Sequence, residues 1–78
     1  MQKMTTGQQV RAARERLEMT QGDLAEAVTA HGAPVSKPFI SLLEADERRP
    51  AVDTAAALSA VLGISLDDLL AEYKVPAT

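Results

Sequence analysis

Polar and basic side chains spaced between Thr20 and Pro50 could bind an anionic partner. Amide, hydroxyl, ammonium and guanidinium groups all donate hydrogen bonds, which phosphate oxygens and the edges of nucleic-acid bases accept. The basic residues in this stretch are Lys37, Arg48 and Arg49. The chemistry that this set suggests is non-covalent recognition.

Two short helices must position these donors, and each has a marked start. Thr20 with Asp23 three residues later resembles a capping box, and Ser36 precedes Lys37 and Pro38, where proline is tolerated in a first helical turn. The apolar positions that place one face of each helix against a core are Leu24, Ala25 and Val28, then Ile40 and Leu43. Two such helices joined by a turn can present the start of the second to the major groove of DNA.

The remaining chain predicts three more helices and no strand. We expect helices over about 7–18, 21–31, 37–45 and 52–62, with a fifth after Ser65. Gly32 and Gly63 are expected to end the second and fourth helices. Asp68 stands at the capping-box position for Ser65. The faces expected to be buried in the first and fifth helices are Val10, Ala13 and Leu17, and Leu66, Leu69, Leu70 and Tyr73.

Length and composition bound the class of protein. The 78 residues predict a single domain, 46% of them are hydrophobic, and the aromatic residues are Phe39 and Tyr73. There is no cysteine, which excludes disulfides and thiolate zinc sites. Apolar runs are far too short to span a membrane and no signal peptide is evident, so we expect a cytoplasmic protein.

The net charge of −3 counts against a nucleic-acid partner, but the charge is unevenly distributed. Basic residues prevail in the first 20 residues, whereas residues 51–78 hold a single lysine against four acids. A dipolar molecule of this kind could still offer a basic edge to phosphate, and its binding should be sensitive to salt.

Residues along most of the chain resemble the lambda-repressor-like helix-turn-helix family, which includes the Cro, C1 and xenobiotic-response-element-type regulators. The matching positions are Gly7, Arg14, Thr20-Gln21, Leu24-Ala25, Val35-Ser36, Ile40-Ser41, Leu43-Glu44, Pro50, Leu58, Leu62 to Leu66 and Leu69-Leu70. The resemblance covers residues 7–70 and leaves short tails, 1–5 and 74–78. It implies a compact all-α five-helix domain that acts as a homodimeric, sequence-specific repressor of transcription.

The resemblance also implies a role for each candidate residue. Base contacts would come from Lys37, Pro38, Ser41 and Leu42, and phosphate contacts from Gln21, Ser36, Arg48 and Arg49. Arg14 and Glu44 match a partly buried ion pair that ties the first helix to the third.

The chain departs from the family pattern at three places. The connection between the second and third helices, over 28–36, is longer than usual, so either the second helix is extended or the turn is an open loop. Asp46 stands where the family often has glycine, and with Glu47 it places negative charge beside the expected phosphate contacts. Pro38 and Leu42 cannot donate hydrogen bonds, so direct readout rests on Lys37 and Ser41, with DNA shape contributing.

Several candidates also have a purely structural interpretation. Lys37 could be a solvated lysine at a helix start, Gln21 a polar first-turn residue, and the Arg48-Arg49 pair a charged loop that balances its acidic neighbours. His31 is expected to interact with carbonyls at a helix end rather than to bind metal. Tyr73 and Val75 could close the core or form a dimer surface.

No catalytic arrangement is evident, because the single histidine lacks a recognisable Ser or Asp partner and no glycine-rich phosphate loop occurs. We therefore expect no enzyme, metal, cofactor or small-molecule ligand. The expected partner is double-stranded DNA. The alternative is a protein-interaction module, such as an antitoxin or anti-repressor, suggested by the net negative charge and the apolar Pro38, Phe39 and Leu42.

Overall fold

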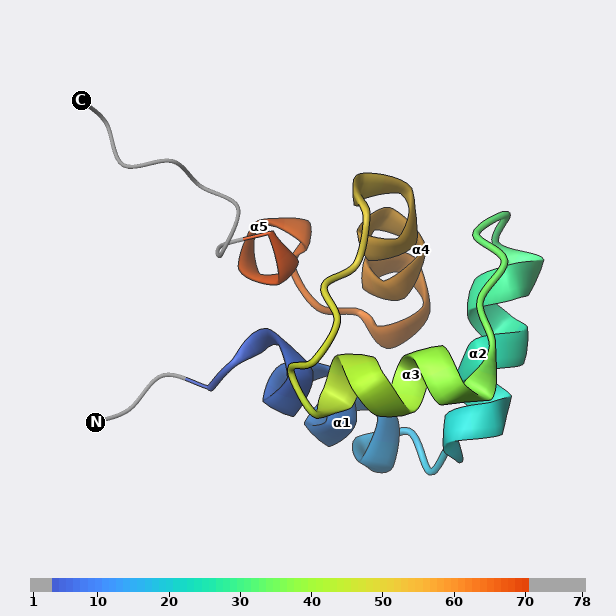
Figure 1. Ribbon diagram of the computed structural model, residues 1–78, viewed down its shortest axis with the longest axis horizontal. Coiled ribbons are helices and arrows are strands. Elements are labelled where there is room, and N and C mark those ends of the chain that lie inside the picture. Colours follow the sequence, from blue (N-terminus) through green and yellow to red (C-terminus); the bar gives the residue numbers. More distant parts are fainter. Residues whose placement is uncertain (1–3, 71–78) are drawn as a thin grey trace.

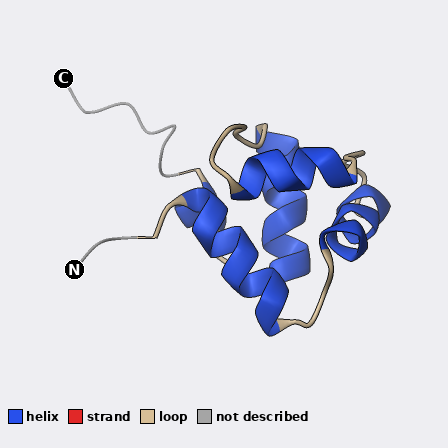
Figure 2. Ribbon diagram, turned by 60° about the horizontal axis from the view of Figure 1, so that its bottom comes forward, coloured by secondary structure: helices blue, strands red, loops and turns tan. Residues whose placement is uncertain are grey.

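The computed structural model describes residues 4–70, and all regular structure in that range is helical (Figures 1 and 2). The helices are α1 (Thr6–Arg16), α2 (Gln21–Ala30), α3 (Lys37–Glu44), α4 (Val52–Leu62) and α5 (Leu66–Leu69). The all-α, five-helix prediction is therefore confirmed. Tyr73 and Val75 lie outside the described residues.

Side-chain caps begin α1, α2 and α3. The hydroxyl of Thr20 accepts the N–H of Asp23, and the Asp23 carboxylate accepts the N–H of Thr20, both at 3.0 Å. Hydrogen bonding from the backbone N–H of Thr20, and next from its side chain, lowers the pKa of the Asp23 carboxyl. Ser36 accepts the N–H of Phe39 at 3.3 Å, as expected, and Thr5 forms a capping box with Gln8 that the sequence analysis had not identified.

The capping box expected at Ser65 was wrong. Ser65 stands at the N-cap position of α5, but its side chain accepts no cap hydrogen bond. The helix has only four residues, and Asp67 and Asp68 in its first turn are exposed, so water can satisfy their N–H groups.

The predicted apolar faces form one core. Leu24, Val28 and Ile40 are fully buried, and Leu43 is only 1% exposed. The exception is Leu17, which is 46% exposed because it lies at the C-cap of α1, beyond the last turn that faces the core.

The packing places α3 on one side of the molecule, against α1 and α2 (Figure 1). On the other side α4 contacts α1, α2 and α5. Gly7 allows the close approach of α1 to α3, because a Cβ at Gly7 would lie 2.5 Å from the carbonyl oxygen of Glu44. The contacts with α1 and α2 thus hold α3 in a fixed orientation.

The long connection is an extended α2 followed by a loop that is closed rather than open. Helix α2 continues to Ala30, and a loop over 31–36 follows, in which Gly32 has a φ of 94°. The Thr29 hydroxyl accepts the N–H of Val35 at 3.1 Å and donates to its carbonyl at 3.2 Å, while Ala33 is buried. The loop is therefore closed against the end of α2. Nowhere in residues 4–70 is there a helix with the length and apolar character needed to cross a membrane.

Candidate nucleic-acid interface

The outer face of α3 carries the side chains predicted to read bases. Lys37, Pro38 and Ser41 are exposed and Leu42 is half-buried, whereas Ile40 on the opposite face is fully buried. This separation follows from the 3.6-residue period, which puts positions 37, 38 and 41 on one side of the helix. The buried face anchors α3 and leaves the four side chains on its outer side.

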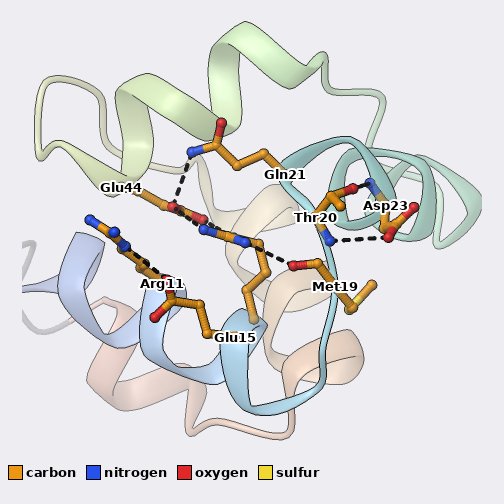
Figure 3. Close-up of polar contacts among 8 residues, drawn as sticks. Arg11, Glu15, Met19, Thr20, Gln21, Asp23 and Glu44 are labelled. Carbon is orange, nitrogen blue, oxygen red and sulfur yellow. Dashed lines mark hydrogen bonds and ion pairs between the residues drawn. The ribbon is translucent and has the colours of Figure 1, made fainter.

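An ion pair fixes α3 to α1. Arg14 donates from Nε to Oε2 of Glu44 at 2.6 Å and from Nη2 to Oε1 at 3.0 Å (Figure 3). The two side chains are only 11% and 5% exposed, and the hydrogen bond to Glu44 raises the pKa of Arg14 above its ordinary value. Arg14 also donates from Nη1 to the carbonyl of Met19 at 2.8 Å. The guanidinium therefore ties together α1, the turn that follows it, and α3.

Gln21 joins the same network from the start of α2. Its side-chain amide donates to Oε1 of Glu44 at 3.1 Å, so Glu44 accepts from both Arg14 and Gln21 (Figure 3). An amide nitrogen has two hydrogens, and this bond uses one of them. Gln21 has a structural role here, and its contact with phosphate stays a prediction.

The other predicted phosphate contacts flank α3. The Ser36 side chain caps the amino end of the helix, and a hollow beside it is also lined by Arg49 and Thr54. Arg48 is exposed in the segment between α3 and α4, where Pro50 is buried. The structure thus places Ser36 and Arg49 beside one hollow, and Gln21 in the network on the far side of α3.

Asp46 lies in the left-handed region, with a φ of 62°. Its carboxylate accepts the N–H of Gly7 at 3.0 Å and the hydroxyl of Thr5 at 2.6 Å. The negative charge expected beside the phosphate contacts therefore caps α1 instead, where the helix dipole favours an anion.

One group of residues was missed from the sequence. Arg11 lines a hollow between α1 and α3, which we call the α1–α3 hollow, together with Arg14, Gln21, Ser41, Glu44 and Ala45. The available signal was the spacing of Arg11 and Arg14, since residues three apart share one helix face.

No group of three or more potential metal ligands occurs among residues 4–70. His31 is exposed at the end of α2, where its backbone N–H donates to the carbonyls of Ala27 and Val28. Within the described part of the chain, the site therefore consists of hydrogen-bond donors and apolar groups on and around α3.

Comparison with known proteins agrees with this arrangement. The helix-turn-helix family matches residues 10–69. The immunity repressor protein of Bacillus phage phi105 is 32% identical over 69 residues, which is 88% of this chain and 44% of the phage protein. The chain thus spans less than half the length of that curated relative.

Two solved structures share the fold. The P22 c2 repressor in complex with synthetic operator 9T, in the presence of Tl⁺, has a TM-score of 0.76 and 33% identity, over 86% of this chain and 94% of that one. The SinR protein in complex with SinI protein has a TM-score of 0.72 and 27% identity, over 88% of this chain and 63% of that one.

Proposed function

This chain belongs to the helix-turn-helix family, and from that premise we propose that it is a sequence-specific DNA-binding repressor of transcription that inserts α3 into the major groove. The observation that carries the proposal is the division of α3 into a buried anchoring face and an exposed face with Lys37 and Ser41. The similarity to a phage immunity repressor and to an operator-bound repressor supports it. In this proposal the protein is not an enzyme and acts in the cytoplasm.

Base readout in this proposal rests on Lys37 and Ser41. The ammonium of Lys37 suits the O6 and N7 acceptors of guanine, and a serine hydroxyl can donate to or accept from either kind of base pair. Pro38 and Leu42 offer apolar contact to a thymine methyl group. The side chain of Lys37 is exposed and makes no hydrogen bond or ion pair within residues 4–70, which leaves its charge available.

Phosphate contacts set the position of α3 in the groove. We assign them to Gln21, Ser36, Arg48 and Arg49, which lie on either side of α3. Contacts of this kind carry no sequence information themselves, but they fix register and orientation on the duplex. The Gln21 amide can serve this role with its second hydrogen while it remains bonded to Glu44.

A homodimer completes the proposal. A dimer related by a two-fold axis would place one α3 in each of two half-sites about one helical turn, roughly 34–36 Å, apart. Sedimentation of the free and DNA-bound protein would show this state directly. A complex containing one protein chain per duplex would contradict it.

The test is selection of a binding site from random duplexes, followed by affinity measurements on variants. Lys37→Ala and Ser41→Ala should each weaken binding to the selected site by about 1–3 kcal/mol and leave binding to random DNA unchanged. Arg48→Ala should weaken both duplexes alike. No enriched motif, or equal losses for all three variants on both duplexes, would refute base readout by α3.

A second candidate is a protein-binding role for the same face. Phe39 and Leu42 are only partly buried and Pro38 is exposed, so an apolar strip remains on α3. The structural similarity to SinR, solved in complex with SinI, adds weight to a protein partner. Failure of the purified chain to retard any duplex would favour this role over DNA binding.

A further inference from the structure

The α1–α3 hollow opens next to the face of α3 that carries Ser41. Its lining comes from three helices: Arg11 and Arg14 on α1, Gln21 on α2, and Ser41 and Glu44 on α3, with Ala45 at the C-cap. Its volume is about 320 Å³, which is large compared with the roughly 30 Å³ that a water molecule occupies in the liquid. The hollow therefore has room for a polar group larger than water.

Charge in this hollow is not balanced. Arg14 and Glu44 neutralise each other, and each nitrogen of the Arg14 guanidinium makes one hydrogen bond, Nε and Nη2 to Glu44 and Nη1 to Met19. Glu44 in turn accepts from Gln21 as well. The remaining charge in the lining is the guanidinium of Arg11, which gives the hollow a net positive charge.

Arg11 is held only by a weak partner. Its Nε lies 3.2 Å from Oε2 of Glu15, and the two side chains are 65% and 55% exposed. An exposed pair at this spacing contributes about 0.3–0.5 kcal/mol, and a basic residue preceding the acidic one is the less favourable order. A phosphate can therefore displace Glu15 at small cost, because hydrogen bonds between guanidinium and phosphate are among the strongest in proteins.

Other donors converge on the same place. In Figure 3, Gln21 from α2 is bonded to Glu44 and Arg11 from α1 is bonded to Glu15, and the second amide hydrogen of Gln21 is not used by Glu44. Arg11 and Gln21 both line the hollow. An anion in the hollow would thus meet donors from α1 and α2.

We infer that Arg11 is a further DNA-contacting residue, which binds a backbone phosphate seated in the α1–α3 hollow, with Glu15 as the competing partner that this phosphate replaces. The inference rests on the proposed function and extends the interface from α3 to α1. Since a phosphate contact is independent of sequence, Arg11 adds affinity and orientation rather than base preference.

The experiment measures binding of the full chain to its selected duplex and to a random duplex over 50–200 mM salt. Loss of one phosphate contact reduces the slope of log K against log salt by about 0.9. Arg11→Ala should show this change in slope on both duplexes. The ratio of the wild-type to the Arg11→Ala binding constant should therefore fall roughly threefold as salt rises across that range. Glu15→Gln, which removes the competitor, should bind both duplexes more tightly than wild type.

The matched control is Arg16→Ala, which removes the same charge from the same helix. Arg16 lies about 140° around α1 from Arg11, is exposed, and does not line the hollow. Its slope should equal that of wild type, and circular dichroism should show that both variants keep their helices. Equal slopes for Arg11→Ala and wild type, or equal losses of affinity for Arg11→Ala and Arg16→Ala, would overturn the inference. Sequence-specific binding by the wild-type chain would still uphold the proposed function in that case. A wild-type chain that binds no duplex would refute both.

Discussion

Single residues in the left-handed region end α1, α2 and α3 in the same way. Glu18, Gly32 and Asp46 each follow the helix C-cap, with φ values of 57°, 94° and 62°. In each case the N–H of that residue and of the next one donate back to carbonyls of the last turn, which is the Schellman arrangement. Glycine usually occupies this position, so Glu18 and Asp46 adopt it at a cost.

The cost is uncompensated at Glu18, which is exposed and whose side chain makes no hydrogen bond within residues 4–70. Glu18→Gly should therefore stabilise the fold by about 0.5–1 kcal/mol, because relief of the left-handed conformation outweighs the added freedom of the unfolded chain. The measurement is the midpoint of urea unfolding.

Glu18→Ala is the matched control for that change. Alanine removes the same side chain but keeps the Cβ, so the left-handed conformation stays unfavourable. The alanine variant should unfold no later than wild type. A glycine variant no more stable than the alanine variant would show that Glu18 is not strained.

The sequence reveals some of these ends but not others. Gly32 and Gly63 were predicted to end their helices because glycine favours a positive φ, and both adopt one. Nothing in the side-chain type of Glu18 indicates that conformation, whereas Asp46 stands where the family often has glycine and aspartate adopts it more readily than most residues. Asp46 offsets its cost through Thr5 and Gly7, which lie about forty residues away in sequence and meet it only in the folded chain.

At the level of elements, the Arg14–Glu44 pair determines how α3 sits on α1 and α2. Glu44→Ala should destabilise the fold by about 3 kcal/mol, because it leaves the guanidinium of Arg14 without its partner in a largely buried place. Glu15→Ala is the control, since it breaks an exposed pair and should change stability by less than about 0.5 kcal/mol. Chemical unfolding of both variants measures the difference, and equal values would show that the buried pair contributes no more than the surface pair.

Helix boundaries could be predicted where a capping residue and the spacing of the apolar residues indicate the same helix end. Helix α4 spans the predicted 52–62, and α3 begins directly after Ser36. The described α5 has only four residues, and the side chain of its N-cap residue Ser65 accepts no cap hydrogen bond. The path of the 31–36 loop depends on Thr29, whose hydroxyl contacts Val35, and no local pattern predicts that contact.

Over the whole molecule, the donors of the candidate interface gather around α3 although the net charge is −3. Two of the acids near these donors are already bonded, Glu44 to Arg14 and Gln21, and Asp46 to the start of α1. The sequence predicted which residues lie on the outer face of α3. It did not predict the α1–α3 hollow, because that surface depends on packing between helices distant in sequence.

The central claim is that this chain recognises double-stranded DNA by sequence. The most direct measurement is a fluorescence-anisotropy titration of the protein into its selected duplex and into a scrambled duplex, repeated over a series of salt concentrations. The account predicts that log K falls linearly with log salt for both duplexes and that the selected duplex binds about a thousandfold more tightly or better at physiological salt. Equal affinity for the two duplexes, or binding that does not change with salt, would contradict it.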